Sequence, residues 1–187
     1  MYHNGKDYQE VDEMALRLRM DYSHFENKLD VFKLAKQLNI VLTEYSSLTP
    51  DQLEDITVYE ELKDGFTVIE KTNGKYEFKT YYNDSIGEAR IRLTIAHEIK
   101  HIVYLEFSPS EKDEDLANHF ARYILAPTCL VMPYIQDHTQ IDMINEFGIS
   151  YEAACNAYKA AENRILSNKA DLEDYENEFI ADYNSRH

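Results

Sequence analysis

The chain has 187 residues, which is enough for one domain with a hydrophobic core and short for two. Apolar residues make up 44% and charged residues 29%, a composition that excludes disordered and fibrous proteins. Because 35 acidic residues oppose 19 Lys and Arg, the formal net charge is −16, which argues against binding to nucleic acid or to an anionic membrane. A basic protein partner is compatible with this charge.

The chain shows no export or membrane signal. Residues 1–7 lack the apolar core of a signal peptide, and no apolar run approaches the ~20 residues of a membrane-spanning helix. The two cysteines, Cys129 and Cys155, form no CxxC motif and no disulfide framework, and we expect them to be reduced and buried. We therefore expect a cytoplasmic protein.

The first half of the chain predicts helices followed by a small sheet. Apolar residues recur at helical spacing over residues 11–22, and Asp30 is the predicted N-cap of a short second helix. The β-branched run 40–42 predicts a strand. Residues 66–82 predict an antiparallel hairpin, because their two apolar runs flank Asn73-Gly74, a pair typical of tight turns.

The second half predicts helices only. The apolar period becomes helical from about 89 to 106, and the next helix is predicted to begin with Ser108 as its N-cap and to end before Pro127. Further helices follow, and the acidic stretch 171–187 is predicted to fray. We expect one α+β domain over 1–187, with a small, mainly antiparallel sheet within 10–127 and a helical part over 128–187.

One stretch indicates chemistry: His97-Glu98-Ile99-Lys100-His101 has the HExxH pattern. Residues i and i+4 of a helix lie on one face about 6 Å apart, so both imidazoles can bind one ion. Glu98 is rotated roughly 100° from His97, which allows it to contact a water at that ion and act as general base. The alternative is a pair of core histidines whose hydrogen bonds are satisfied within the protein.

A catalytic zinc site has three protein ligands and one open position. Downstream, Glu114, Ala117, Asn118 and Ala121 form one helical stripe, in which the alanines allow a close approach of helices. Glu114 can supply the third ligand, and Asn118 can orient a ligand through a hydrogen bond.

Three other acidic residues compete with Glu114: Glu111, Asp113 and Asp115. Glu111 shares the face of Glu114 and is the strongest competitor. The favourable position of acids at a helix N-terminus explains Glu111 and Asp113 without any metal.

Two remaining features have simpler explanations. His119 and His138 have no partner at ligand spacing, and we expect both to be satisfied by hydrogen bonds. Residues 139–167 resemble a helix-turn-helix in pattern, but their charge is negative, so we expect them to pack or to dock a substrate rather than to bind DNA.

The motifs together resemble the ImmA/IrrE metallopeptidases. That family has HExxH, then E-x-x-A-N-x-F-A, then a leucine-rich helix end with proline; this chain has residues 97–101, Glu114-Asp115-Leu116-Ala117-Asn118-His119-Phe120-Ala121 and Tyr123-Ile124-Leu125-Ala126-Pro127. The resemblance covers roughly residues 10–165. It implies a compact, zincin-like (gluzincin-like) fold with Glu114 as third zinc ligand, and cleavage of a helix-turn-helix repressor. The family often has an acid where this chain has Leu116, which favours Glu114 further.

The sequence thus predicts a zinc-dependent endopeptidase, with His97, His101 and Glu114 holding Zn²⁺ and Glu98 moving the proton. Manganese or iron would also suit these ligands. The alternative is a non-catalytic regulator that binds a basic repressor without cleaving it. Glu98 favours the enzyme, because a structural metal site has no use for a base.

Overall fold

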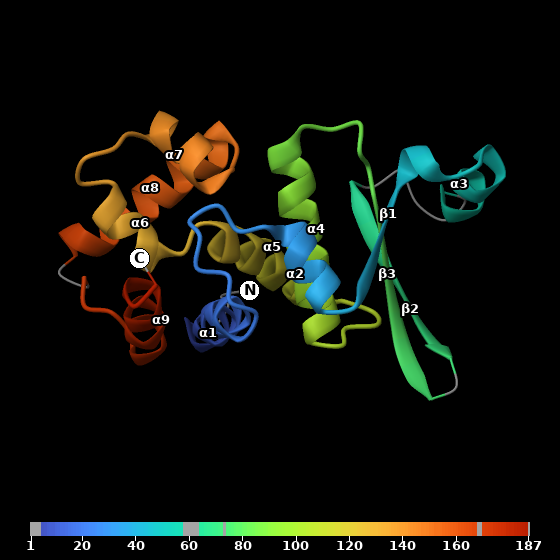
Figure 1. Ribbon diagram of the computed structural model, residues 1–187, viewed down its shortest axis with the longest axis horizontal. Helices are drawn as coiled ribbons and strands as arrows, with labels where there is room; N and C mark the ends of the chain where they lie inside the picture. The colour runs from blue at the N-terminus through green and yellow to red at the C-terminus, as the bar shows by residue number, and fades with distance from the viewer. Residues whose placement is uncertain (1–4, 58–63, 73, 168–169, 187) are drawn as a thin grey trace.

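The computed structural model describes residues 5–57, 64–72, 74–167 and 170–186. It is a mixed α+β structure, as expected, in which helices dominate (Figure 1). The elements in chain order are α1 (Gly5–Asp21), α2 (Val31–Gln37), β1 (Ile40–Glu44), the 3₁₀ turn η1 (Tyr45–Ser47), α3 (Pro50–Thr57), β2 (Gly65–Thr72), β3 (Lys75–Tyr82), α4 (Glu88–Val103), α5 (Glu111–Leu125), α6 (Thr128–Tyr134), α7 (Gln140–Phe147), α8 (Tyr151–Leu166) and α9 (Asp174–Asn184).

The sheet has three strands in the order β1-β3-β2. β2 and β3 form the expected antiparallel hairpin; Gly74 has a φ of 81°, while Asn73 lies outside the described residues. β1 pairs with β3 in parallel over five residues, while β2 pairs with β3 antiparallel over eight, so the hairpin agrees with the expectation of a mainly antiparallel sheet and β1 adds one parallel strand. Because β2 occupies one edge of β3, β1 is left with the other edge, and the chain crosses over from β1 to the hairpin through α3.

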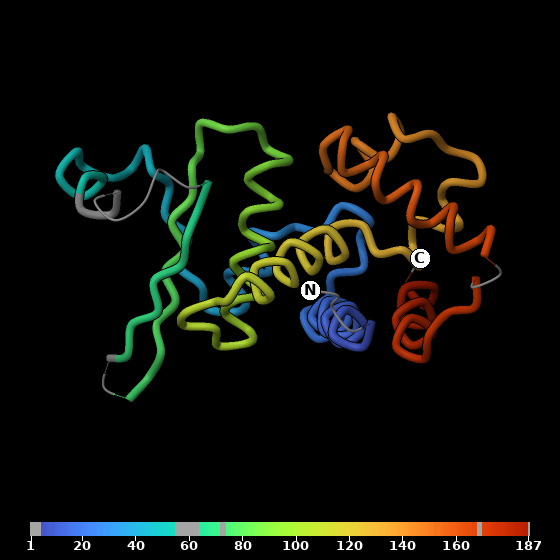
Figure 2. Tube along the Cα trace, turned by 180° about the vertical axis from the view of Figure 1, so that it is seen from behind, coloured from blue at the N-terminus to red at the C-terminus, as the bar shows by residue number. Residues whose placement is uncertain are grey.

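Two crossed helices form the centre of the molecule. α4 packs on the sheet and α2, and α5 crosses α4, as both views show (Figures 1 and 2). α1 packs on α5 and on α9, while α6, α7 and α8 form the end of the molecule away from the sheet. Among the described residues, no helix combines the length and the apolar character needed to cross a membrane.

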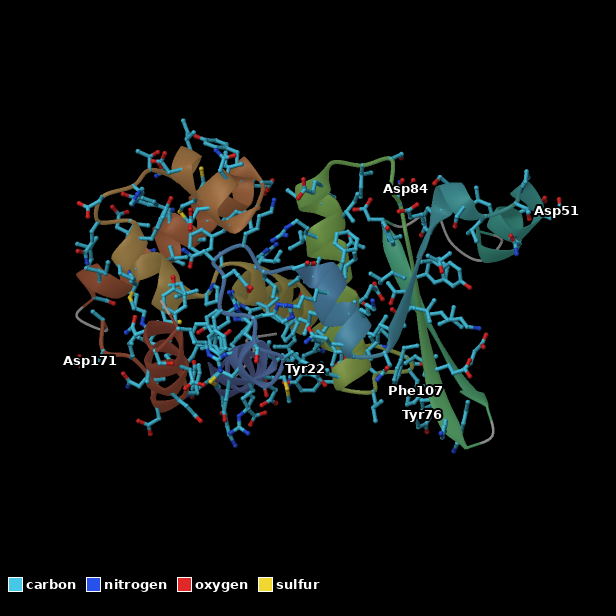
Figure 3. All side chains as sticks on the ribbon, viewed as in Figure 1. Tyr22, Asp51, Tyr76, Asp84, Phe107 and Asp171 are labelled. Atoms are coloured by element: carbon cyan, nitrogen blue, oxygen red, sulfur yellow. The ribbon has the colours of Figure 1, made fainter. Side chains whose placement is uncertain are left out.

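The turn between α4 and α5 differs from its prediction. α4 ends at Val103, since Leu105 takes a left-handed conformation (φ 53°). The N-cap of α5 is Ser110 and not Ser108, because the Asp113 carboxylate accepts the backbone N–H of Ser110 (2.8 Å) in a reciprocal capping box. Figure 3 shows Phe107 of this turn beside Tyr76 of the hairpin, and their ring centroids are 5.7 Å apart.

The acidic C-terminus is folded, so the prediction that it frays is wrong for α9. Phe179 is fully buried and packs on Phe25, and the fully buried Glu176 is paired with Arg164 (2.6 Å). The apolar and paired side chains of α9 therefore hold it against the rest of the chain despite its acidic composition. Of the two free cysteines, Cys129 is buried as expected, whereas Cys155 is only partly buried.

Candidate metal centre

The HExxH residues lie on α4 as helical spacing predicts. The rings of His97 and His101 have centroids 4.8 Å apart, and their Nε2 atoms approach to 3.0 Å. His101 is buried and His97 is partly buried. The two imidazoles therefore converge on one point beside α4.

α5 brings Glu114 to the same point. One carboxylate oxygen lies 3.2 Å from Nε2 of His97, and the other lies 3.5 Å from Nε2 of His101. Two ligand atoms that are each ~2.0–2.1 Å from a tetrahedral zinc ion lie about 3.3 Å apart. The observed separations match that value, so a single ion can reach all three side chains.

The approach of α5 depends on small residues. Ala117 and Ala121, on the same stripe as Glu114, are fully buried in α5, the helix that crosses α4. Larger side chains at these positions would hold the two helices further apart. The stripe predicted from the sequence thus combines two fully buried alanines with Glu114, whose carboxylate lies beside the histidines.

Each of the two histidines has its Nδ1 beside an oxygen of another side chain. Nδ1 of His97 lies 3.2 Å from the amide oxygen of Asn118, as the sequence predicted, and Nδ1 of His101 lies 2.7 Å from Glu106. Both oxygens can accept, so in the tautomer in which each Nδ1 carries the proton, each Nε2 has a lone pair for a metal ion. In that tautomer the two Nε2 atoms, 3.0 Å apart beside the Glu114 carboxylate, form a donor set that fits a metal ion.

The electrostatics keep His97 in the form that binds metals. Burial lowers the pKa of His97, and the neighbouring His101 lowers it further, against the opposing effect of Glu114. Neutral imidazole is the ligand form. The Glu114 side chain is 47% exposed while that of His101 is 8% exposed, so the group is open to solvent on the side of Glu114.

Glu98 is buried in α4 and lies outside the group of possible ligands, as a general base should. Its charge acts on Tyr45, which follows β1: burial raises the pKa of Tyr45 to about 12, with smaller contributions from Glu98 and Asp64. The role of Glu98 as a base stays a prediction.

The three competing acids do not join the group, which among the described residues consists of His97, His101 and Glu114. Asp113 turns its carboxylate to Ser110, whose hydrogen bonds lower the pKa of Asp113. Glu111 and Asp115 are exposed.

The two further histidines considered in the sequence, His119 and His138, have partners, as expected. Nε2 of His119 lies 2.7 Å from Asp12. Nδ1 of His138 lies 3.0 Å from the carbonyl oxygen of Tyr134, and the two rings stack.

Sequence reasoning missed Glu106 and Lys100. Glu106 binds His101, and the buried Lys100 donates to both oxygens of Glu106 (2.5 and 2.7 Å). The only signal in the sequence was Lys100, a charged residue within a helix whose apolar residues predict burial. The position of Glu106 depends on the turn at Leu105, which the sequence did not indicate.

A search against protein-family models and against the curated proteins found no match to this chain.

Proposed function

We propose that the protein is a zinc-dependent endopeptidase in which His97, His101 and Glu114 hold the ion. The observation that carries this proposal is the convergence of two imidazole Nε2 atoms and one carboxylate at separations of 3.0 to 3.5 Å. Zinc suits two imidazoles and a carboxylate, and such a site retains an open position for chemistry.

The residues of the chain divide the work of peptide hydrolysis. A zinc ion bound here would supply Lewis-acid polarisation of the scissile carbonyl and would acidify water. Glu98 takes the proton of the attacking water and delivers it to the leaving amine. Asn118 and Glu106 hold the two imidazoles with their lone pairs toward the ion.

The family and substrate belong to the same proposal. The motifs resemble ImmA/IrrE metallopeptidases, which implies a zincin-like fold and a helix-turn-helix repressor as substrate, and we propose a cytoplasmic location. The net charge of −16 supports a basic protein partner. The mixed α+β fold, with the HExxH helix packed on the sheet, is compatible with that assignment.

Glu98→Gln tests the enzyme against the non-catalytic regulator. The variant keeps the size and shape of the side chain but cannot accept the proton, so zinc content should stay and cleavage should fall by at least ~100-fold. The assay incubates the purified protein with the repressor encoded beside it, with and without a chelator. Glu88→Gln, in the exposed first turn of the same helix, is the matched control. If wild type and Glu98→Gln relieve repression equally in cells, the protein is the non-catalytic regulator instead.

A further inference from the structure

The helix that carries His97 and His101 ends in a turn that involves a ligand directly. Leu105 is left-handed, its N–H donates to the carbonyl of Ile102 (3.0 Å), and the N–H of Glu106 donates to the carbonyl of His101 (2.9 Å). This pair of bonds is a Schellman motif. The backbone of Glu106 is thereby fixed to the backbone of His101.

The side chain of Glu106 then returns to the imidazole of the same residue. Oε2 of Glu106 accepts from Nδ1 of His101 at 2.7 Å, and the same oxygen accepts from Nζ of Lys100 at 2.7 Å. The Glu106 side chain is 16% exposed and that of Lys100 is 1% exposed. His101 is therefore held by one residue, Glu106, whose backbone N–H binds the His101 carbonyl and whose partly buried carboxylate binds the His101 ring.

Lys100 extends this connection to the other ligand helix. Besides its two bonds to Glu106, Nζ donates to the backbone carbonyl of Asp113 (3.1 Å). The next residue is Glu114. The buried ammonium of Lys100 thus contacts two groups. One is Glu106, which orients His101 of α4, and the other is the backbone that carries Glu114 of α5.

We propose that Lys100 and Glu106 are positioning residues of the metal centre, which fix the tautomer of His101 and the distance between the α4 and α5 ligands. We call Lys100, Glu106 and the carbonyl of Asp113 the ligand clamp. This inference rests on the proposed metal site. It adds that the affinity of the site for metal depends on a lysine inside the HExxH motif.

The Lys100–Glu106 ion pair is better suited to positioning the metal ligands than to stabilising the fold. A buried ion pair loses hydration on both partners, and its replacement by apolar side chains of similar volume is often neutral or stabilising. A hydrogen bond from a ligand imidazole to a carboxylate, in contrast, fixes the ring, and loss of such a bond lowers metal affinity ~10–100-fold. Lys100 also balances the charge of Glu106, so the carboxylate orients His101 without adding net negative charge.

The test uses the double variant Lys100→Met/Glu106→Leu, which replaces the pair by apolar side chains and leaves no unpaired buried charge. Zinc affinity is measured by competition with a chromophoric chelator, and folding is checked by circular dichroism. We expect a folded protein whose zinc affinity is ~10–100-fold lower than that of wild type. In the metal-free protein, ¹⁵N shifts of His101 should show the proton on Nδ1 in wild type and a growing Nε2–H form in the variant.

A matched control removes another ion pair that involves α4. Lys28→Met/Glu88→Leu replaces an exposed pair at 3.0 Å and should leave both zinc affinity and the His101 tautomer unchanged. If the clamp variant does not fold, the single variant Glu106→Gln decides. It keeps an oxygen acceptor for His101 but is a weaker partner for Lys100. Its affinity for zinc should fall several-fold.

Two failures are distinguishable. A folded clamp variant with wild-type zinc affinity and an unchanged His101 tautomer would overturn the role of the clamp and leave the metal site intact. Wild-type protein that binds no zinc would overturn the proposed function itself.

Discussion

Arg92 of α4 donates from its Nε to the backbone carbonyl of Gly148 at 2.9 Å. A second bond runs from its Nη2 to the carbonyl of Phe147 (3.0 Å), and the arginine is almost completely buried. Arg92 lies five residues before His97, while Phe147 and Gly148 end α7. One side chain therefore ties the helix of the candidate metal centre to the C-terminal helices.

Arg92→Met should be strongly destabilising, because it leaves two helix-end carbonyls without their donor. Hydrogen bonds from a charged group contribute ~1.5–3 kcal/mol each, so we expect the loss of both to lower the free energy of unfolding by about 3–6 kcal/mol. Urea unfolding measures this change in the free energy of unfolding. Arg90→Met, on the same helix but in an exposed ion pair with Asp64, should change stability by less than ~1 kcal/mol. Equal effects of the two substitutions would contradict this role of Arg92.

Gly148 itself requires the absence of a side chain. Its φ is 63°, and an added Cβ would lie 2.6 Å from Cε of Lys28 and 3.0 Å from Cζ of Arg92. Gly148→Ala should cost at least ~1–2 kcal/mol of unfolding free energy, since it adds left-handed strain and displaces the Arg92 guanidinium. The control is Gly87→Ala at the N-cap of α4, where an added Cβ meets nothing within 4 Å. Thermal unfolding of both variants gives the comparison.

Glu176 makes the fold sensitive to acid. Burial raises the pKa of Glu176, but hydrogen bonds from Arg164 (2.6 and 2.7 Å) and from Tyr123 (3.0 Å) outweigh it, so the pKa lies below its ordinary value of 4.5. A carboxyl whose pKa is lower in the folded state stabilises the fold above pH 4.5, and this stabilisation is lost as pH falls through the folded pKa.

Glu176→Gln should therefore unfold more easily at pH 7, by about 2–4 kcal/mol, because Arg164 loses its charged partner. Its unfolding free energy should also fall less steeply than that of wild type as pH drops below 4.5. Urea titrations at several pH values measure both effects. The exposed Glu178→Gln on the same helix should follow wild type. Parallel pH profiles for wild type and Glu176→Gln would exclude Glu176 as the source of acid sensitivity.

Helical periodicity was sufficient to predict the parts of the candidate site that depend on one helix. The i, i+4 spacing placed His97 and His101 together, and the stripe on α5 placed Glu114 opposite them with Asn118 one turn on. These relationships follow from the geometry of a single helix and from one close helix crossing.

The relationships that were missed depend on irregular backbone or on distant segments. Glu106 reaches His101 only because Leu105, a residue without glycine's freedom, adopts a positive φ. Ser108 was preferred over Ser110 because Pro109 follows it, although Asp113 completes the capping box of Ser110. The burial of Glu176 required Arg164 from another helix, so composition alone predicted fraying.

Metal analysis tests the three ligands one at a time. His97→Ala, His101→Ala and Glu114→Ala should each lose most bound zinc, because a site reduced to two protein ligands has a much lower affinity. Glu111→Ala is the matched control, since Glu111 is an exposed acid in the first turn of the same helix as Glu114. Full zinc occupancy in Glu114→Ala together with loss of zinc in Glu111→Ala would assign the third ligand to Glu111.

The last prediction concerns how the proposed peptidase selects its substrate. A repressor that binds DNA carries a basic face, and a chain with a net charge of −16 attracts that face over a distance. Salt weakens such attraction, since the Debye length falls from ~10 Å at 0.1 M to ~3 Å at 1 M ionic strength. Cleavage of the repressor should therefore slow as salt rises, and operator DNA should compete by covering the same basic surface.

A short uncharged peptide that contains the scissile bond separates docking from chemistry. Its cleavage depends on the metal centre and Glu98 alone, so its rate should be insensitive to salt and to operator DNA, while casein should be cut slowly. Time courses at low and high salt, with and without operator, measure all of these rates. Rapid digestion of casein, or repressor cleavage that ignores both salt and operator, would exclude charge-guided docking, because neither result requires the substrate to meet an acidic surface before it reaches the metal centre.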